Sequence, residues 1–276
     1  MHIDDALARF TLQLEADGRS VHTVNQYRRH VRALAAWLGP ECDIAALSHE
    51  DIARFFVSPA AKQRADGGLK RATSMNALRG SISCFFRYLH EAGHVPVNPT
   101  RLIRRARCGP PPPRYLTDNE QGRLLAELEA DDSFEARRDL ALVRLMLATG
   151  IRLGSAIALD ADDLDGDMLW LRTIKGDRPD RKVLSASVAA ELRDWIGNRD
   201  GPVFCDRTGT RNSHRQAQRR FAGWCEAAGI RRASLHGLRH SFAVRMYRET
   251  RDLLAVQRAL GHRSISATVG YARVAD

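Results

Sequence analysis

Apolar positions in the first hundred residues recur every three or four residues, which is the spacing of one buried helix face. One run predicts a helix around residues 7–14, and a second predicts a helix that ends near residue 38 and is capped by Ser20. A third helix is expected from Ser48 and a fourth over residues 72–92. Turn-forming segments separate them, so this half is predicted to be a four-helix bundle. The apolar positions are Leu7, Phe10, Leu14, Val24, Tyr27, Val31, Leu34, Leu38, Leu78, Ile82, Phe85, Phe86 and Leu89.

The second half combines helices with short strands. A capping box that begins at Thr117 precedes an apolar helix, and a strongly apolar helix is expected over residues 134–149. Residues 168–171 and 182–184 are typical of strands, with Lys175-Gly176-Asp177 in the hairpin between them. Helices follow to the end of the sequence. The predicted fold class is mainly α with a small β-sheet (α+β).

Four consecutive prolines, Pro110 to Pro113, separate the two halves. Proline fixes φ and lacks an amide hydrogen, so this run cannot be helix interior or central strand. It favours a stiff, extended connector. We therefore predict a helical N-terminal domain over residues 1–105, a linker over 106–114 and a second domain over 115–276. The linker arginines suit a connector that passes along a phosphate backbone. The alternative is that the segment is simply a solvated spacer.

Charge narrows the class of partner. The 276 residues include 43 Lys and Arg against 33 Asp and Glu, so the formal net charge is +10. Such a chain is attracted to polyphosphate, and double-stranded DNA is the expected partner, although charge alone fits a basic protein without one equally well. The candidate DNA contacts sit on predicted polar helix faces and in the linker, where they belong either to a DNA clamp or to ordinary solvated faces. They are Arg28, Arg29, Arg32, Lys70, Arg71, Arg79, Arg87, Arg104, Arg105 and Arg107.

Other features exclude several classes of protein. No run of about 18 apolar residues predicts a membrane span, and the sequence from Met1 to Asp5 does not resemble a signal peptide. The five cysteines are scattered, odd in number and without a CxxC pair, so reduced cysteines and no zinc site are expected. The acidic residues over 160–167 are expected to form a surface loop rather than a magnesium site. We expect a cytoplasmic, bacterial-type, nucleoid-associated protein that needs no cofactor and no metal.

Five short motifs of the second half carry the candidate chemistry. They are Thr149-Gly150-Ile151-Arg152, Lys175, His236-Gly237-Leu238-Arg239-His240, Leu260-Gly261-His262 and Tyr271. The planar guanidinium of arginine matches two phosphate oxygens at once. A tyrosine can form a covalent ester with phosphorus. Together these residues fit phosphodiester chemistry that needs no metal.

The order of these motifs, after a basic helical domain, resembles the tyrosine recombinase (phage integrase) family, especially its short Xer-like members, over nearly the whole chain. The resemblance implies an N-terminal SAM-like, core-binding helical bundle and a C-terminal tyrosine recombinase catalytic domain. It implies a site-specific recombinase that cuts and rejoins DNA through a 3′-phosphotyrosyl intermediate without metal or ATP, with strand exchange through a Holliday junction. The catalytic residues it implies are Arg152, Lys175, His236, Arg239, His262 and Tyr271.

The resemblance also implies how the phosphate is held. Arg152 and Arg239 would bind the non-bridging oxygens and stabilise the charge that grows in the transition state. His236 and His262 would add hydrogen bonds to the same oxygens. Taken singly, each of these residues has an ordinary structural explanation, such as Arg152 meeting the dipole of the preceding helix.

Proton transfers follow from the same resemblance. Tyr271 attacks phosphorus, His236 accepts its proton by analogy, and Lys175 protonates the leaving 5′ oxygen. We interpret His240 as a core histidine, because His236 and Arg239 already fill the phosphate roles.

Two departures from the family pattern affect the interpretation. Ser155 stands where the family usually has an acidic residue, and the chain stops five residues after Tyr271. So short a tail predicts a monomer when free and a homo-tetramer or hetero-tetramer on paired DNA sites. Nicking and religation of the type IB topoisomerase kind, or an inert DNA-binding factor with this fold, are the alternatives. The target sequence and the biological role do not follow from the residues.

Overall fold

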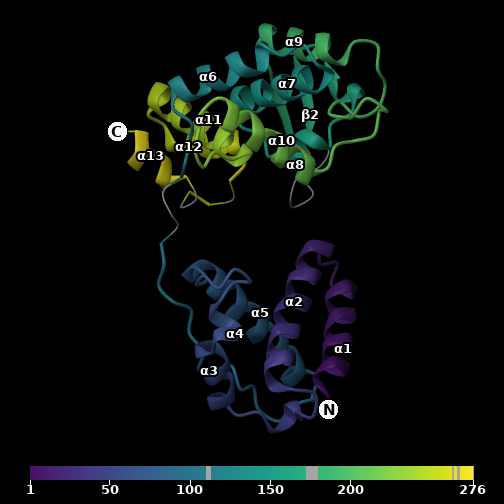
Figure 1. The fold of residues 1–276 in the computed structure, drawn as a ribbon, viewed down its shortest axis with the longest axis vertical. Coiled ribbons are helices and arrows are strands. Elements are labelled where there is room, and N and C mark those ends of the chain that lie inside the picture. Colours follow the sequence, from purple (N-terminus) through teal and green to yellow (C-terminus); the bar gives the residue numbers. More distant parts are fainter. Residues whose placement is uncertain (110–112, 172–179, 263, 266–267, 276) are drawn as a thin grey trace. The chain divides into compact units, whose positions relative to one another are not determined.

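A computed structural model describes residues 1–109, 113–171, 180–262, 264–265 and 268–275 (Figure 1). The chain divides into two compact units, Met1–Pro110 and Pro111–Asp276. Each unit encloses its own hydrophobic core. None of the helices in the described part of the chain is long and apolar enough to span a membrane.

The N-terminal unit is a helical bundle. Each helix expected from the apolar spacing is present, and a further short helix, α4, begins at a proline. The helices are α1 (Ile3–Ala16), α2 (Val21–Leu38), α3 (His49–Val57), α4 (Pro59–Lys62) and α5 (Ala72–Glu91), with a 3₁₀ turn at Ile44–Ala46. The Ser20 hydroxyl caps α2 by accepting from the Thr23 amide, and Ser48 forms a capping box with Asp51 at the start of α3.

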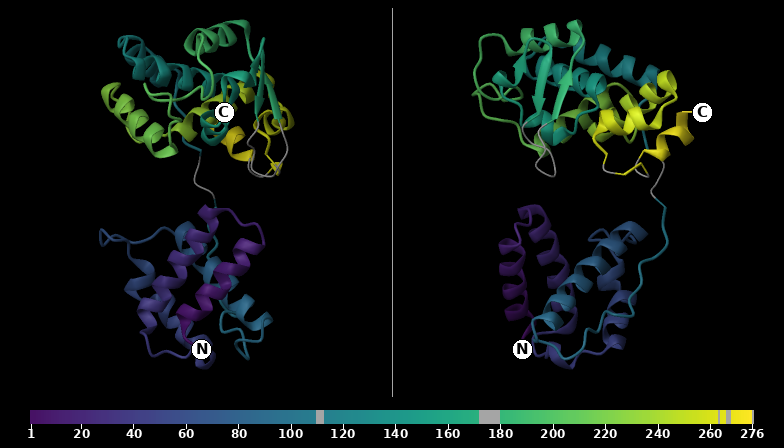
Figure 2. Two further views of the ribbon diagram at one scale, coloured as in Figure 1. Left: turned by 90° about the vertical axis from the view of Figure 1, so that its right-hand side faces the viewer. Right: turned by 180° about the vertical axis from the view of Figure 1, so that it is seen from behind.

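Helices α1, α2 and α5 pack on one another in this bundle (Figure 2). Aromatic side chains are part of the core between them. Phe10 of α1 meets the ring of Phe85 edge-on, with centroids 5.5 Å apart. Phe85 and Phe86 of α5 are fully buried. Their burial orients the opposite face of α5, which carries arginines, toward solvent.

The C-terminal unit places helices around a small sheet, as its sequence pattern predicts. Its helices are α6 (Asp118–Glu129), α7 (Phe134–Thr149), α8 (Leu153–Ile157), α9 (Ala186–Ile196), α10 (His214–Ala227), α11 (Leu235–Thr250), α12 (Leu253–Leu260) and α13 (Val269–Ala275). Its strands are β1 (Leu164–Asp165), β2 (Met168–Leu171) and β3 (Asp180–Val183). They pair antiparallel in the order β1-β2-β3, with Leu169 opposite Lys182. The predicted hairpin residues 175–177 lie outside the described residues.

Helix α7 is the centre of this unit and packs against α6, α9 and α11 (Figure 1). It ends at Gly150, whose φ of 63° is left-handed. A Cβ atom there would lie 2.4 Å from the ring of Phe242 in α11. Only glycine can therefore turn the chain at this point and deliver Arg152 to the side of α11.

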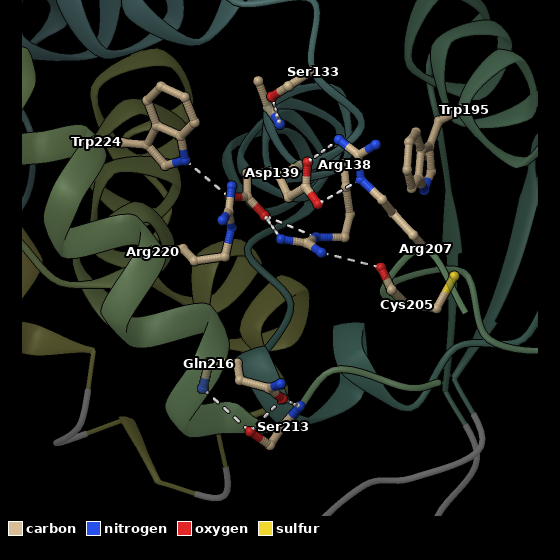
Figure 3. Close-up of polar contacts among 12 residues, drawn as sticks. Ser133, Arg138, Asp139, Trp195, Cys205, Arg207, Ser213, Gln216, Arg220 and Trp224 are labelled. Atoms are coloured by element: carbon tan, nitrogen blue, oxygen red, sulfur yellow. Dashed lines mark hydrogen bonds and ion pairs between the residues drawn. The ribbon is translucent and has the colours of Figure 1, made fainter. Parts of the chain in front are cut away.

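A buried polar network fastens α7 to α10 (Figure 3). Asp139 accepts hydrogen bonds from Arg138, from the Arg220 guanidinium at 2.6 Å and from the Trp224 indole at 2.9 Å. Arg138 also donates to the Cys205 carbonyl at 3.1 Å. Both carboxylate oxygens of Asp139 are thus satisfied, as burial requires.

The acidic residues after α8 do not form the simple surface loop expected from the sequence. Asp163 is 1% exposed, and its carboxylate accepts from the Asp160 amide at the start of a 3₁₀ turn, Ala161–Asp163. Arg211 pairs with Asp160. The run is partly internal because backbone amides and an arginine compensate its charge. Among the described residues, no group of His, Cys, Asp and Glu is arranged to hold a metal ion.

Candidate active site

Helix α11 carries two of the candidate catalytic residues, His236 and Arg239, in its first two turns, and His240 follows them. Ser234 caps the helix by accepting from the Gly237 amide at 3.2 Å. Residues three and four positions apart share a helix face, so Arg239 and His240 lie one turn beyond His236. The rings of His236 and His240 meet edge-on, with centroids 4.4 Å apart.

Arg239 is buried, with 3% of its surface exposed. Its guanidinium donates to the Gly150 carbonyl at 2.5 Å and to the Leu260 carbonyl at 2.6 Å. Burial, and then the charge of Arg152, lower the pKa of Arg239 to about 10, so it remains a cation at neutral pH. Among the described residues, no carboxylate pairs with Arg239 or Arg152.

The C-terminus of α12 holds the two arginines in place. Its last carbonyls lack partners within the helix and carry the negative end of the helix dipole. Lys182 of β3 donates to the Ala259 carbonyl at 2.9 Å and Arg239 donates to the next carbonyl, of Leu260. Arg152, at the start of α8, lies 3.5 Å from the third, of Gly261. Three cations from three elements therefore converge on consecutive peptide groups.

Tyr271 lies on α13, which packs against α11 of the same chain (Figure 1). The side chain is 3% exposed, and its hydroxyl is 2.8 Å from Nδ1 of His240. The His262 ring lies nearly parallel to the phenol, with centroids 6.4 Å apart. His262 Nδ1 is 3.0 Å from the Thr268 hydroxyl, which fixes the ring.

Electrostatics keep these side chains uncharged in the absence of DNA. Burial raises the pKa of Tyr271, although Arg239 opposes the change. Burial and neighbouring cationic groups lower the pKa of His240 and of His262 to about 4. Partial burial, Arg239 and Arg152 also lower the pKa of His236, although the residue keeps an exposed surface. At pH 7 the phenol is therefore the donor to a neutral His240 ring.

The structure thus brings together five of the six residues expected to be catalytic, all except Lys175, which lies outside the described residues. Those five are Arg152, His236, Arg239, His262 and Tyr271. His240, interpreted from the sequence as a core histidine, instead bonds the Tyr271 hydroxyl. Its spacing of four residues from His236 was the available signal. Ser155 is buried in α8, one turn after Arg152.

A cleft of about 390 Å³ in the N-terminal unit gathers several of the candidate DNA contacts. Its lining includes Arg79, Arg87, Arg101 and Arg105. None of these forms an ion pair among the described residues. The Arg105 guanidinium lies over Gly80, where a Cβ atom would approach it to 2.9 Å. The cleft is therefore a concentration of uncompensated positive charge.

The remaining candidate contacts differ in their surroundings. Lys70 donates to the Ala61 carbonyl at 2.7 Å, so its ammonium is already used within the bundle. Arg28 is partly buried on α2. The others are exposed, namely Arg29, Arg32, Arg71, Arg104 and Arg107.

Comparison with known families matches both units. Residues 114–276 match the Phage integrase family, and residues 7–93 match the Phage integrase N-terminal SAM-like domain. The chain is 34% identical to tyrosine recombinase XerC of Vibrio parahaemolyticus over 276 residues, which cover 96% of this chain and 87% of that protein. It is 33% identical to tyrosine recombinase XerC of Neisseria meningitidis, with 99% and 93% of the two chains covered.

Solved structures show the same fold. A lambda integrase dimer bound to a COC′ core site superposes with a TM-score of 0.77 at 19% identity, covering 98% of this chain and 77% of that one. The XerH site-specific recombinase in a post-cleavage complex with a palindromic difH substrate gives a TM-score of 0.75 at 19% identity, with 96% and 82% covered.

Proposed function

The chain belongs to the Phage integrase family and is a tyrosine site-specific recombinase, and we propose that Tyr271 is the nucleophile with which it cuts DNA. The observation that carries this proposal is the placement of Tyr271 close to Arg239, which in turn lies close to Arg152, with no carboxylate among the described residues paired to either arginine. A phosphodiester between Arg152 and Arg239 would supply the missing negative charge.

We propose that the reaction proceeds by direct displacement at phosphorus. The oxygen of Tyr271 forms a bond to phosphorus as the bond to the 5′ oxygen breaks, which gives a 3′-phosphotyrosyl link and a free 5′-hydroxyl. Lys175 is the proposed acid for the leaving oxygen. Attack by the 5′-hydroxyl of another strand reverses the step without ATP and leads to strand exchange through a Holliday junction.

Four residues position the phosphate in this proposal. Arg152 and Arg239 are held by the carbonyls at the end of α12, so their remaining N–H groups are ready for the non-bridging oxygens. His236 is exposed and His262 is oriented by Thr268, which suits both as neutral donors to the same oxygens. No step of this scheme calls for a metal or cofactor.

The DNA partner is proposed to contact both units. In the N-terminal unit, the arginine-lined cleft and the exposed arginines of α2, α5 and the 104–107 segment offer charge for the phosphate backbone. Because α13 packs on its own chain, we propose a free monomer that assembles as a homo-tetramer or hetero-tetramer on paired sites. Lambda integrase forms a tetramer on a Holliday junction, which supports such an assembly. A DNA substrate also fits the expected cytoplasmic, nucleoid-associated location.

The test is Tyr271→Phe, assayed with a nicked suicide substrate that carries the chain's own recombination site, recovered from DNA fragments bound in cells. The variant should bind this DNA nearly as well as the wild type but form no adduct that survives a denaturing gel, because only the nucleophilic oxygen is missing. Tyr247→Phe, which changes another tyrosine in the same unit, is the matched control and should still form the adduct. A persistent adduct in Tyr271→Phe would assign the nucleophile elsewhere.

A further inference from the structure

The Tyr271 hydroxyl needs a proton acceptor when it attacks phosphorus. Family analogy assigns that role to His236, but among the described residues the group hydrogen-bonded to the hydroxyl is His240, at 2.8 Å. His236 contacts His240 rather than the phenol, with ring centroids 4.4 Å apart. The Nδ1 atom of His262 is engaged with Thr268. Geometry therefore singles out one base.

We propose that His240 is a catalytic residue that accepts the Tyr271 proton directly at Nδ1 during DNA cleavage. This inference rests on the proposed role of Tyr271. The step is balanced: the phenol oxygen bonds to phosphorus, the bond to the 5′ oxygen breaks, and the phenol proton passes to His240. The leaving oxygen takes a separate proton from the general acid, which is proposed to be Lys175. In rejoining, the same proton returns from His240 to the phenol oxygen.

The ring is already in the right tautomer. Because Tyr271 keeps its proton in the free protein and donates it, Nδ1 of His240 carries only its lone pair and the ring proton sits on Nε2. A ring with the proton on Nδ1 would face the phenol hydrogen with its own. The hydrogen bond in the DNA-free chain thus already has the donor and the acceptor that the proposed proton transfer needs.

The groups around His240 make its ability to accept a proton depend on whether DNA is bound. The charged group that acts on His240 is Arg239, the preceding residue on α11, whereas the neighbouring rings of His236 and His262 are neutral at pH 7. Burial and the Arg239 charge oppose a positive charge on His240 while no phosphate is present. A phosphodiester held by Arg239, the adjacent residue on α11, brings the opposite charge and favours proton acceptance. The phenol is therefore activated only when DNA occupies the site.

The buried position of Tyr271 is compatible with this role. At 3% exposure, its hydroxyl meets a phosphate only after local movement of α13. His240 and Arg239 are consecutive residues on α11, so a phosphate bound by Arg239 lies near the ring that holds the hydroxyl. For direct proton transfer, this movement must keep the hydrogen bond between the Tyr271 hydroxyl and His240.

Two variants separate proton transfer from simple orientation. In His240→Asn the side-chain amide oxygen stands near the place of Nδ1 and accepts a hydrogen bond, but it cannot take a proton at neutral pH. In His240→Leu both functions are lost. Both variants should form the covalent adduct about 100-fold more slowly than the wild type, with unchanged DNA affinity and far-UV circular dichroism. Near-wild-type cleavage by His240→Asn would reduce the role to orientation and overturn the proposal.

A second test replaces Tyr271 by a ring-fluorinated tyrosine. Its phenol ionises more readily than that of tyrosine, so cleavage depends less on a base. The His240→Asn defect should then shrink to a few-fold, whereas the defect of His236→Asn should stay unchanged. Equal defects of His240→Asn with both tyrosines, or a bypass confined to His236→Asn, would contradict the assignment. Lack of any adduct with wild-type protein would instead overturn the proposed nucleophile itself, so the two failures are distinguishable.

Discussion

At the scale of single residues, the candidate site depends on two arginines, Arg152 and Arg239, with which no carboxylate among the described residues pairs. Arg239 is nearly fully buried, and within the described part of the chain its guanidinium donates to the main-chain carbonyls of Gly150 and Leu260. A buried charge without a counter-ion is costly, and several kcal/mol of that cost is recovered when an anion arrives. A phosphate that binds to Arg239 is therefore expected to be stabilised strongly by its buried positive charge.

The same environment predicts how stability changes with pH. The pKa of His240 is about 4 in the folded chain and near 6.5 in an unfolded chain. Between these two pH values the unfolded state binds more protons than the folded state. The contribution of His240 to the free energy of unfolding is therefore fully present above pH 6.5 and is lost as the pH falls toward 4.

Urea unfolding of the full chain from pH 7.5 to pH 4.5 measures this effect. The wild type should lose more stability over this range than His240→Asn, which has no titrating ring at that position. The carboxylates titrate alike in both proteins, so the difference between the two curves isolates His240. Parallel curves would show that His240 titrates normally in the folded protein.

At the scale of elements, the end of α12 organises the site. Lys182 of β3 donates a hydrogen bond to the Ala259 carbonyl. This contact connects the sheet to the end of α12, whose next carbonyls bind the arginines. The ammonium also pairs with Asp180 at 2.9 Å, and the Lys182 side chain as a whole is 17% exposed. We infer that β3 supports the placement of Arg239 although it contributes none of the described phosphate ligands.

Lys182→Met tests this support. Loss of a hydrogen bond from a charged donor should lower the free energy of unfolding by about 1.5 kcal/mol. Covalent-complex formation should slow several-fold, because the α12 carbonyl that positions Arg239 would be held less firmly. Arg181→Met, on the adjacent exposed position of β3, should change stability by less than about 0.5 kcal/mol. If the two variants behave alike in unfolding and cleavage assays, Lys182 does not brace α12.

The Asp139 network is the second element-scale connection, because it joins α7, which delivers Gly150 and Arg152, to α10. Asp139→Ala leaves Arg138 buried without its partner and should cost about 3–5 kcal/mol. Asp194→Ala removes a carboxylate from an exposed ion pair with Arg137 and should cost less than about 1 kcal/mol. Urea unfolding followed by tryptophan fluorescence compares them, and equal losses would mean that the network contributes little.

At the scale of the whole molecule, the chain consists of two units with separate cores and a proline-rich segment between them. Positive charge is spread over both units, so DNA binding should depend on each. This distribution predicts a salt dependence to which the N-terminal arginines contribute independently of the catalytic residues.

The double variant Arg87→Gln/Arg105→Gln tests that contribution in the full chain. Both residues line the cleft without an ion pair among the described residues, and each should contact about one phosphate. The slope of log affinity against log salt should therefore become shallower by about two. The control is Arg54→Gln/Arg64→Gln, since Arg54 and Arg64 already pair with carboxylates. Equal slopes for the double variant and the wild type would place the cleft away from the DNA.

Much of the fold follows from local pattern. Apolar spacing predicts α7 over residues 134–149 and the observed helix is Phe134–Thr149, because a long amphipathic or apolar run has few alternatives to a helix. The prediction of strand β3 is less accurate, since residues 182–184 are expected and the observed strand is Asp180–Val183. Four-residue strands are specified by their partners more than by their own sequence.

The sequence by itself determined the class of fold, the order of the motifs and the family, because these depend on residue types and spacing along the chain. Only the tertiary structure decided that Lys182, Arg239 and Arg152 converge on consecutive carbonyls of α12. It alone placed the Tyr271 hydroxyl on His240 rather than on His236. The partners in these contacts come from different elements and lie 21 to 109 residues apart, so no local pattern encodes them. They arise from the packing of α11 against α12 and α13, and packing is set by the whole core at once.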